Sequence, residues 1–407
     1  MAVERVSDAA RLRIAVLGDF DGVHTRAWLR WFIERGHDVH AISYYAPAAP
    51  LDGVTLHVLK PGRRAAASGV PSGAAGGAGS RVPRGLLRLL HGARYRMAGL
   101  PRVLRAIGPD VFHAHFLVEH GFYGALAGFH PYVVTAWGSD VLVEPQRDPV
   151  SKQIARWTMR RADLLTSNNE YMAEHMAALG APRSKIEVVT LGADRSFLDA
   201  HEQSVNVRGR APGEPRCVLS TRAHEPLYNI HDVIDASARV ARSQPDVRLA
   251  MAHGGTLTAG LQRRAQDAAG RVEFLGFLDS AALREAMTEA EVFVSVPSSD
   301  GTSVALLQAM AAGCFPIVSD LPTQRELVED GVNGFRVPPH RPEALAERIA
   351  RALSDPDLRR RAAAANRALV ERRGLNETEM ARMEAAYRRL AAAHALTTDN
   401  RQQPTER

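Results

Sequence analysis

The sequence predicts an α/β protein with two domains, each built on a parallel sheet flanked by helices. Three observations support this prediction. Short runs of β-branched and aliphatic residues alternate with amphipathic stretches of helical period, which is the βαβ pattern. The alternation starts near residue 11 and again near residue 216, after a polar stretch rich in Gly and Pro at residues 201–215. At 407 residues, the chain is long enough for two cores of ordinary size.

The polar stretch at 201–215 is interpreted as the linker between the domains. We expect the first domain at residues 1–200 and the second at 212–374. A last helix is predicted over residues 377–396, followed by a polar tail to residue 407. It carries apolar residues at helical spacing, namely Met380, Met383, Ala386, Tyr387 and Leu390.

The composition limits the cellular compartments and the binding partners that we expect for this protein. The 45% hydrophobic fraction, the absence of an 18-residue apolar run and the N-terminus without a secretory hydrophobic region predict a cytoplasmic protein. Cys217 and Cys314 are far apart, which argues against a disulfide framework or a Cys-based metal site. The net charge of +6 suits a nucleotide-containing substrate, an acidic membrane or a nucleic acid, but a compositional bias of the genome explains it equally well. No zinc-finger spacing or RNP-type aromatic run supports nucleic acid.

Two segments of the first domain have unusual composition. Residues 62–80 are Gly-, Ala- and Ser-rich and predict a mobile loop. Residues 81–105 place arginines among leucines, which permits contact with an anionic membrane but is more simply a pair of surface helices. These arginines are Arg84, Arg88, Arg94, Arg96, Arg102 and Arg105.

The first predicted strand, residues 13–17, is followed by a polar turn. Gly22 lies at the carboxyl edge of the strand, where open parallel sheets bind ligands, and His24 would look into that edge. We expect an acceptor contact at Gly22 and an acceptor or phosphate contact at His24, with a capping or surface role for His24 as the alternative. The D-F-D sequence at 19–21 could also be a metal-binding D-x-D, but it follows the very first strand, before a nucleotide-binding half exists.

The stretch at residues 296–319 predicts an anion site in the second domain. A buried strand over 292–296 runs into a polar turn, and a helix leaves the turn and stops at Gly313. Asp300, Thr302 and Ser303 can cap this helix, while Gly301 lets the backbone approach a ligand. The free N–H groups and the positive helix end favour a phosphate. Gln308 lies about six residues into the helix, roughly 9 Å along its axis.

This stretch resembles the donor-binding signature of the family-4 retaining glycosyltransferases of GT-B fold. The matching residues are P-S-S-D-G-T-S, then L-L-Q-A-M-A-A-G-C-F-P-I-V, then D-G-V-N-G. The resemblance implies two facing Rossmann-like domains with a deep cleft between them. It also implies that Asp300 meets the transferred sugar, that Gly301, Thr302 and Ser303 meet the diphosphate, and that Gln308 meets the ribose. Asp300 and Gln308 stand where the family usually has Glu, with its spacing intact.

Further motifs of the second domain resemble the same family. Arg222 follows a strand that ends at Ser220, where the family has the arginine that clamps the donor diphosphate. The lysine that usually follows is absent, and Tyr228 and Asn229 stand in its place. The glycine turn at Gly254 and the strand end at Gly276 resemble the family's G-x-G turn and base-binding strand end.

In the first domain the resemblance rests on H-A-H-F and T-A-W-G-S-D. It implies acceptor contacts for His115, Trp137 and Asp140, although His113 and His115 fit the buried core equally well. Trp137 stands where many members have His, so Asp140 is the better catalytic candidate on this side. The resemblance also implies that the last helix packs back on the first domain.

The activity implied is transfer of a sugar from a UDP- or GDP-linked donor to an unidentified acceptor, with retention at the anomeric carbon. The acceptor could be a natural-product aglycone or a cell-envelope glycan or lipid. We expect no metal or further cofactor, because Arg222 and the helix N-terminus can take the charge of the leaving group, with Arg222, Asp300 and Asp140 as catalytic candidates. The alternatives are a nucleotide-sugar epimerase, a non-catalytic binder on the same fold, and a nucleic-acid binder. The sequence does not predict the oligomeric state.

Overall fold

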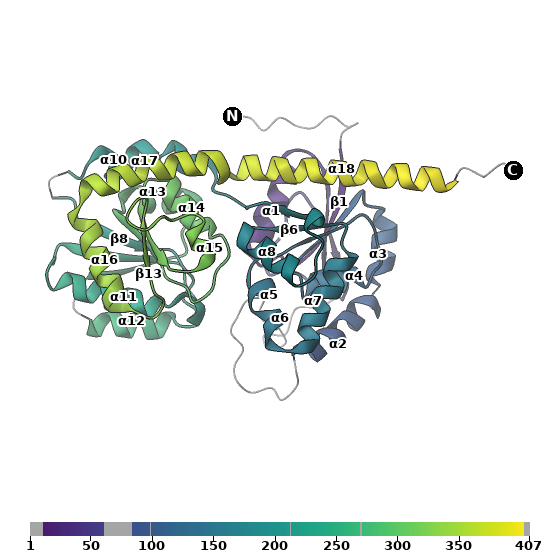
Figure 1. The fold of residues 1–407 in the computed structure, drawn as a ribbon, viewed down its shortest axis with the longest axis horizontal. Coiled ribbons are helices and arrows are strands. Elements are labelled where there is room, and N and C mark those ends of the chain that lie inside the picture. The colour runs from purple at the N-terminus through teal and green to yellow at the C-terminus, as the bar shows by residue number, and fades with distance from the viewer. Residues whose placement is uncertain (1–10, 61–83, 98, 212, 269–270, 403–407) are drawn as a thin grey trace. The chain divides into compact units, whose positions relative to one another are not determined.

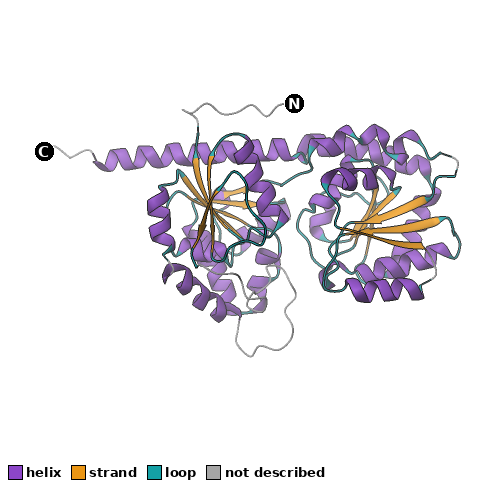
Figure 2. Ribbon diagram, turned by 180° about the vertical axis from the view of Figure 1, so that it is seen from behind, coloured by secondary structure: helices purple, strands orange, loops and turns teal. Residues whose placement is uncertain are grey.

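The fold is that of a computed structural model, which describes residues 11–60, 84–97, 99–211, 213–268 and 271–402 (Figure 1). The predicted mobile loop at 62–80 and the end of the polar tail lie outside the described residues. The chain divides into two compact units, one formed by residues 1–189 and 380–407 and the other by residues 190–379. Each unit has a parallel sheet with helices on both faces (Figure 2).

The first unit has a seven-stranded sheet in the order β3-β2-β1-β4-β5-β6-β7, with parallel pairing throughout. Its strands are β1 Arg13–Leu17, β2 Asp38–Ser43, β3 Thr55–Val58, β4 Val111–His115, β5 Tyr132–Thr135, β6 Leu164–Ser167 and β7 Ile186–Val188. Its helices are α1 Val23–Glu34, α2 Arg84–Met97, α3 Leu100–Ile107, α4 His120–Ala125, α5 Ser139–Leu142, α6 Glu144–Arg147, α7 Pro149–Arg161 and α8 Glu170–Ala178, with a short 3₁₀ turn at Arg183–Lys185.

The second unit has a six-stranded sheet in the order β10-β9-β8-β11-β12-β13, again all parallel. Its strands are β8 Arg216–Ser220, β9 Val247–Ala252, β10 Arg271–Gly276, β11 Val292–Ser295, β12 Phe315–Ser319 and β13 Phe335–Val337. Its helices are α9 Arg195–Asp199, α10 Val205–Arg208, α11 Ile230–Ala241, α12 Thr258–Asp267, α13 Ser280–Glu289, α14 Val304–Ala311, α15 Pro322–Arg325, α16 Pro342–Ser354 and α17 Pro356–Arg373, with 3₁₀ turns at His201–Gln203 and Pro226–Tyr228.

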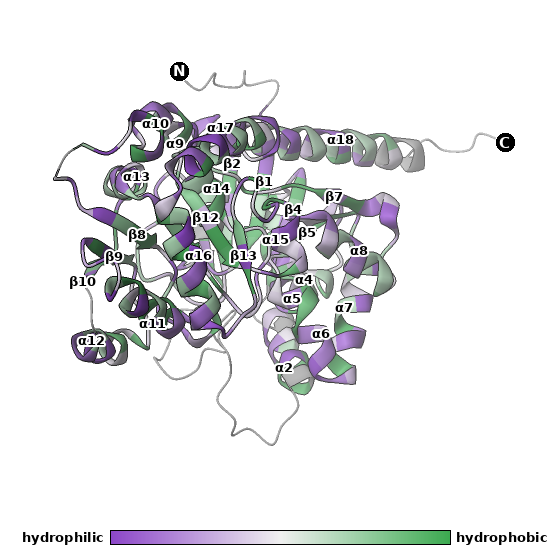
Figure 3. Ribbon diagram, turned by 60° about the vertical axis from the view of Figure 1, so that its left-hand side comes forward, coloured by the Kyte–Doolittle hydropathy of each residue, from purple (hydrophilic) through white to green (hydrophobic). Residues whose placement is uncertain are grey.

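The central strands of both sheets are buried on both faces, which explains the apolar runs that predicted them. In β4, β5 and β12 every residue is buried, and the strands are among the most hydrophobic parts of the chain (Figure 3). In each sheet the order in which successive strands are added reverses once, between β1 and β4 in the first sheet and between β8 and β11 in the second. Parallel sheets bind ligands beside such reversal points, at the carboxyl ends of the strands.

The last helix, α18 Asn376–Gln402, is longer than predicted. Met380, Met383 and Tyr387 are fully buried, and the part of the helix from residue 380 belongs to the first unit. The Tyr387 ring stacks on Phe32 of α1 with centroids 5.1 Å apart. The helix therefore contributes core residues to a unit whose other elements all lie before residue 190.

The stretch at 201–208 differs from the predicted linker. It forms a 3₁₀ turn and α10, and it belongs to the second unit. The Asn206 side chain is buried and donates to the carbonyls of Glu291 at 2.8 Å and Gly313 at 3.0 Å. Its polar residues thus satisfy buried backbone groups, so polarity was a misleading signal for a linker.

None of the described helices is long and apolar enough to cross a membrane. Of the arginines at 81–105, Arg94, Arg102 and Arg105 are exposed, while the side chains of Arg84 and Arg96 lie outside the description. Arg88 is buried and donates to Ser151 Oγ at 2.9 Å and Glu144 Oε2 at 2.6 Å. It is therefore a core residue of the first unit rather than part of a basic surface.

Candidate active site

A group of polar residues lies at the carboxyl edge of the second sheet, where β8 and β11 are neighbours. Arg222 lies just beyond β8, and Asp300 and Ser303 lie between β11 and α14. The Arg222 guanidinium donates from Nη2 to Asp300 Oδ2 at 2.9 Å and from Nη1 to Ser303 Oγ at 2.5 Å. The fold thus brings together three of the residues that the sequence assigned to the donor.

Tyr228 holds Arg222 in place from another side. The guanidinium carbon lies 4.3 Å from the centroid of the Tyr228 ring, which is a cation–π contact. This contact gives the tyrosine a role at the position where the family resemblance leads one to expect lysine. Tyr228 orients the Arg222 guanidinium and, unlike lysine, brings no positive charge of its own.

The Asp300 carboxylate is partly buried beside this cation. Burial raises the pKa of Asp300, while the charge of Arg222 and the N–H of Gly301 lower it. Desolvation and the charge of Arg222 thus act on the pKa of Asp300 in opposite directions. A ligand that engages Arg222 would compete for one of the groups that keep Asp300 ionised.

The N-terminus of α14 is built as the sequence predicted, with one refinement. Ser303 is the N-cap, and its hydroxyl accepts from the N–H of Leu306 at 3.3 Å, whereas the Asp300 carboxylate accepts from Arg222. Neighbouring α15 holds the turn, because Thr323 Oγ1 donates to the carbonyl of Asp300 at 2.9 Å and Gln324 Nε2 to that of Gly301 at 3.2 Å. The turn therefore presents a fixed helix end, which suits an anion.

Asn229 also supports the turn between β11 and α14. Its backbone is left-handed, with φ of 50°, and its buried amide donates to the Val296 carbonyl at 2.9 Å and to Ser298 Oγ at 3.0 Å. These bonds tie the loop after β8 to the loop after β11. These contacts position the two loops, and direct contact of Asn229 with the donor stays a prediction.

The glycine turn after β9 lies close to the loop after β8. A Cβ at Gly255 would lie 2.5 Å from the carbonyl oxygen of His224, so only glycine fits there. Gly254, the predicted donor contact, donates its N–H to His253 Nδ1 at 2.9 Å and accepts from the N–H of His224 at 3.1 Å. Gly276 ends β10 with a φ of 68°, and its carbonyl accepts from the N–H of His253 at 2.5 Å.

The acceptor-side residues lie in the first unit, at the carboxyl ends of its strands. Gly22 is the N-cap of α1 and is exposed, with φ of −76°, and the side chain of His24 lies outside the description. Asp140 is buried, and its carboxylate accepts from the N–H groups of Leu117 at 2.8 Å, Gly138 at 2.9 Å and Trp137 at 3.0 Å. Burial raises the pKa of Asp140, and these backbone donors oppose the shift. The geometry is that of a loop-positioning carboxylate.

The two predicted histidines belong to an aromatic cluster in the core of the first unit. His113 bonds Tyr387 through Nδ1 and Thr135 Oγ1 through Nε2, the latter at 2.7 Å, and burial lowers its pKa well below the usual value. The His115 ring lies 5.3 Å from Trp28 and 5.5 Å from the half-buried Trp137. The core role, one of the two alternatives for His113 and His115, is therefore the one their contacts support.

Sequence reasoning missed Glu119, which follows β4. Its side chain is 17% exposed and lies 4.0 Å from Arg88. Burial raises the pKa of Glu119 to about 7, with Glu144, Asp140 and Asp19 adding to the shift and Arg88 opposing it. A carboxyl group with such a pKa can exchange a proton near neutral pH. No motif marked this residue, because its environment comes from three separate segments.

Comparison with solved structures supports the fold. The chain resembles the Anabaena protein HepE in complex with UDP, with a TM-score of 0.68, 17% identity, and coverage of 93% of this chain and 100% of that one. It also resembles sucrose-phosphate synthase from Thermosynechococcus elongatus, with a TM-score of 0.70, 19% identity, and coverage of 94% and 100%. At these identities the likeness concerns the fold alone.

Family models match both units. Residues 22–192 match the glycosyl transferase 4-like domain, and residues 204–369 match glycosyl transferases group 1. Both units of the chain thus match glycosyltransferase family models, and the fold is of the GT-B class.

Curated glycosyltransferases are similar over part of the chain. A phosphatidyl-myo-inositol mannosyltransferase of Mycobacterium tuberculosis is 34% identical over 173 residues, which are 40% of this chain and 45% of that protein. A glycogen synthase of the same organism is 28% identical over 287 residues, or 68% of this chain and 67% of that protein. The chain thus matches about half the length of the mannosyltransferase.

Two further residues stand out against the pattern of this glycosyltransferase family. Gln308 is half-buried on the second turn of α14, and its amide makes no hydrogen bond to any residue in the described part of the chain. Phe277, which lies in the predicted base-binding strand end but was not itself predicted as a site residue, is 77% exposed beside Gly276, with its ring 4.6 Å from that of His253. An exposed phenylalanine beside a half-buried histidine at a strand end offers a surface on which a nucleobase can stack.

Proposed function

We propose that this protein transfers a sugar from a nucleoside diphosphate sugar to an acceptor, with retention at the anomeric carbon. The observation that carries the proposal is the contact of Arg222 with both Asp300 and Ser303 at the N-terminus of α14. This arrangement offers a cation, a helix end and a carboxylate within one turn. Diphosphate and sugar are the ligand groups that need these three features together.

The donor would extend along the carboxyl edge of the second sheet. In this proposal the diphosphate lies between Arg222 and the α14 N-terminus, the sugar beside Asp300, and the base near Phe277 and His253. Gln308 would meet the ribose. The UDP and UDP-glucose complexes of the Anabaena protein of similar fold agree with a uridine nucleotide as one donor class, with GDP as the other.

The transfer step needs a sink for negative charge. As the acceptor hydroxyl forms its bond to the anomeric carbon, the bond from that carbon to the diphosphate oxygen breaks, and the departing diphosphate takes the acceptor's proton. Arg222 and the helix end would stabilise the charge that develops on the leaving group. We propose on this basis that the reaction needs no metal and no additional cofactor.

The acceptor would bind in the first domain, near the turn that starts α1. Gly22, His24 and Trp137 remain the predicted contacts, and Glu119 joins them as a group that can hold a proton near neutral pH. Asp140 would act by shaping the loop around Trp137. A natural-product aglycone and a cell-envelope glycan or lipid, the latter with contact to an anionic membrane, are the acceptor classes we propose.

A nucleotide-release assay tests this function. UDP- and GDP-sugars would be supplied with fractionated extract as the acceptor source, and free UDP or GDP measured. Acceptor-dependent release is the expected result. Conversion of the donor sugar without any acceptor would indicate an epimerase, and binding without release under every acceptor would indicate a non-catalytic binder.

A further inference from the structure

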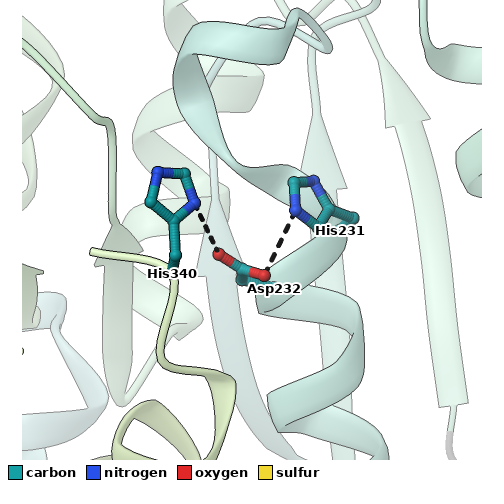
Figure 4. A group of neighbouring side chains, drawn as sticks. All are labelled: His231, Asp232 and His340. Carbon is teal, nitrogen blue, oxygen red and sulfur yellow. Dashed lines mark ion pairs between the residues drawn. The ribbon is translucent and has the colours of Figure 1, made fainter. Parts of the chain in front are cut away.

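A second cluster lies in the second unit, apart from Arg222 and Asp300. His231 and Asp232 occupy the first turn of α11, and His340 lies in the turn between β13 and α16 (Figure 4). His231 Nε2 is 3.2 Å from Asp232 Oδ1, and His340 Nδ1 is 3.8 Å from Asp232 Oδ2. One potential ligand atom from each residue lies within 4.8 Å of the others, and the described residues contain no other group of three that meets this condition.

The Asp232 carboxylate has one oxygen atom whose hydrogen-bonding capacity is not satisfied. The residue is buried, with 7% of its surface exposed, and its Oδ2 atom has no hydrogen-bond partner. The approach of His340 at 3.8 Å is too long for a hydrogen bond. A buried acceptor without a partner is costly, so this oxygen needs a further ligand.

His340 is arranged as metal-binding histidines are. Its Nδ1 faces Asp232, while its Nε2 lies 3.1 Å from Ser298 Oγ, which is in turn bonded to Asn229. A ligating imidazole generally has its second nitrogen held by such a polar partner, which fixes the ring. The backbone of His340 is left-handed, with φ of 59°, a conformation that side chains other than Asn, Asp and His seldom adopt.

We propose that His231, Asp232 and His340 bind a divalent transition-metal ion, Zn²⁺ in the first place. Two imidazoles and one carboxylate form a ligand set that zinc accepts, whereas Mg²⁺ and Ca²⁺ prefer oxygen ligands alone. Tetrahedral zinc places its ligand atoms roughly 3.3 Å apart, given bonds of about 2.0–2.1 Å. His340 must therefore move by about an ångström, and its side chain, 61% exposed, is free to do so.

The bound ion would stabilise the second unit and would take no part in the transfer reaction. The ion would connect α11 with the turn before α16, and through the His340–Ser298 hydrogen bond it would reach the loop between β11 and α14. That loop is also the one that carries Asp300. Metal binding is thus expected to stiffen the second unit while leaving a water-accessible fourth position beside the exposed histidines.

Metal binding can be measured without any assay of transfer. Untagged protein, stripped with a chelator, would be titrated with Zn²⁺ against a competing chromophoric chelator. We expect one ion per chain and a rise in melting temperature. His340→Gly and His231→Ala are each expected to weaken binding at least about tenfold and to abolish the thermal shift.

The variants are chosen so that misfolding cannot explain the loss. Glycine adopts the left-handed backbone of His340 without strain, so His340→Gly should fold as the wild type does, which circular dichroism would check. His130→Ala is the matched control, because His130 is a half-buried histidine paired with Asp163 at 2.6 Å in the first unit. Wild-type protein that binds no Zn²⁺, or equal binding by wild type, His340→Gly and His231→Ala, would overturn the proposal.

Discussion

Arg222 is the residue on which the proposed donor site depends most. It is the cation that contacts both Asp300 and the cap of α14, and Tyr228 supplies its orientation but no charge. We expect Arg222→Ala to cost about 1.5–3 kcal/mol of nucleotide or transition-state binding, the size of a charge-assisted hydrogen bond. Titration calorimetry with UDP and GDP, together with turnover, measures the loss.

The control for this variant is Arg263→Ala, which removes an exposed arginine from α12 in the same unit. It lowers the net charge equally without touching the site. Unchanged nucleotide affinity and turnover in Arg222→Ala would remove Arg222 from the donor site.

Gln308 tests how far the family's ribose contact applies to this chain. A glutamate accepts from two ribose hydroxyls, whereas an amide offers one acceptor oxygen and an NH₂ group. Gln308→Glu should therefore tighten nucleotide binding by about 1 kcal/mol. Gln262→Glu, on exposed α12, adds the same charge elsewhere and should leave affinity unchanged. Weaker binding by Gln308→Glu would mean that the amide serves a different local network.

Much of the second-domain site could be predicted at this scale, because its residues follow one another along a strand, a turn and a helix. Ser303 caps α14, as local sequence order suggests, whereas the place of Arg222 beside it was implied by the family resemblance. The roles of Asn229 and Asp140 could not be foreseen, since their partners come from loops that only the folded sheet brings together. Phe277 and Glu119 were not predicted as site residues for the same reason. The exposure of Phe277 and the burial of Glu119 arise from tertiary packing.

At the scale of elements, the Glu384 carboxylate adds a polar cluster to the apolar contacts that join α18 to the first unit. Glu384 accepts from Arg35 at 2.5 Å, Arg388 at 2.7 Å and Trp31 at 3.3 Å, and His37 lies 3.3 Å away. Although burial opposes it, the bonds from His37, Arg388 and Arg35 lower the pKa of Glu384 to about 2. The carboxylate thus links α1, α18 and the turn before β2.

This shift predicts a pH-dependent stability. A carboxylate whose pKa is lower in the folded state stabilises the fold above its usual pKa, and that contribution is lost as the pH falls toward the folded value. A fall from 4.5 to about 2 corresponds to up to about 3 kcal/mol. Glu384→Gln should lower the free energy of unfolding by this order at pH 7, and the gap should close between pH 4.5 and 2.

Urea unfolding at a series of pH values measures the effect. Glu174→Gln, on the exposed face of α8, serves as the control and should change stability little at any pH. A gap between wild type and Glu384→Gln that stays constant down to pH 2 would show that the ion-pair cluster is not its cause.

Elements with a clear period were predicted well, and those that serve as connections were not. β8, β11 and α14 begin and end close to where their apolar patterns indicated. The stretch at 201–208 was misjudged because its polar side chains bond to buried carbonyls. Helix α18 runs beyond its predicted end at residue 396, to Gln402.

At the scale of the whole molecule, the two proposals give different responses to metal removal. The transfer reaction, with its charge carried by Arg222 and the α14 N-terminus, should proceed at an unchanged rate in the presence of EDTA. The melting temperature should nevertheless fall, because the ion proposed at His231, Asp232 and His340 would be removed. Loss of turnover that Mg²⁺ or Mn²⁺ restores would contradict the metal-free mechanism.

The most direct test of the central claim is hydrogen–deuterium exchange of the wild-type protein with and without UDP or GDP. The account predicts that nucleotide slows exchange at the backbone amides of residues 300–304 and 222–229, around the α14 N-terminus and the loop after β8. Residues 253–256 should follow if the base lies near His253 and Phe277. Protection confined to other parts of the chain, or no protection at saturating nucleotide, would contradict the placement of the donor at this edge of the second sheet.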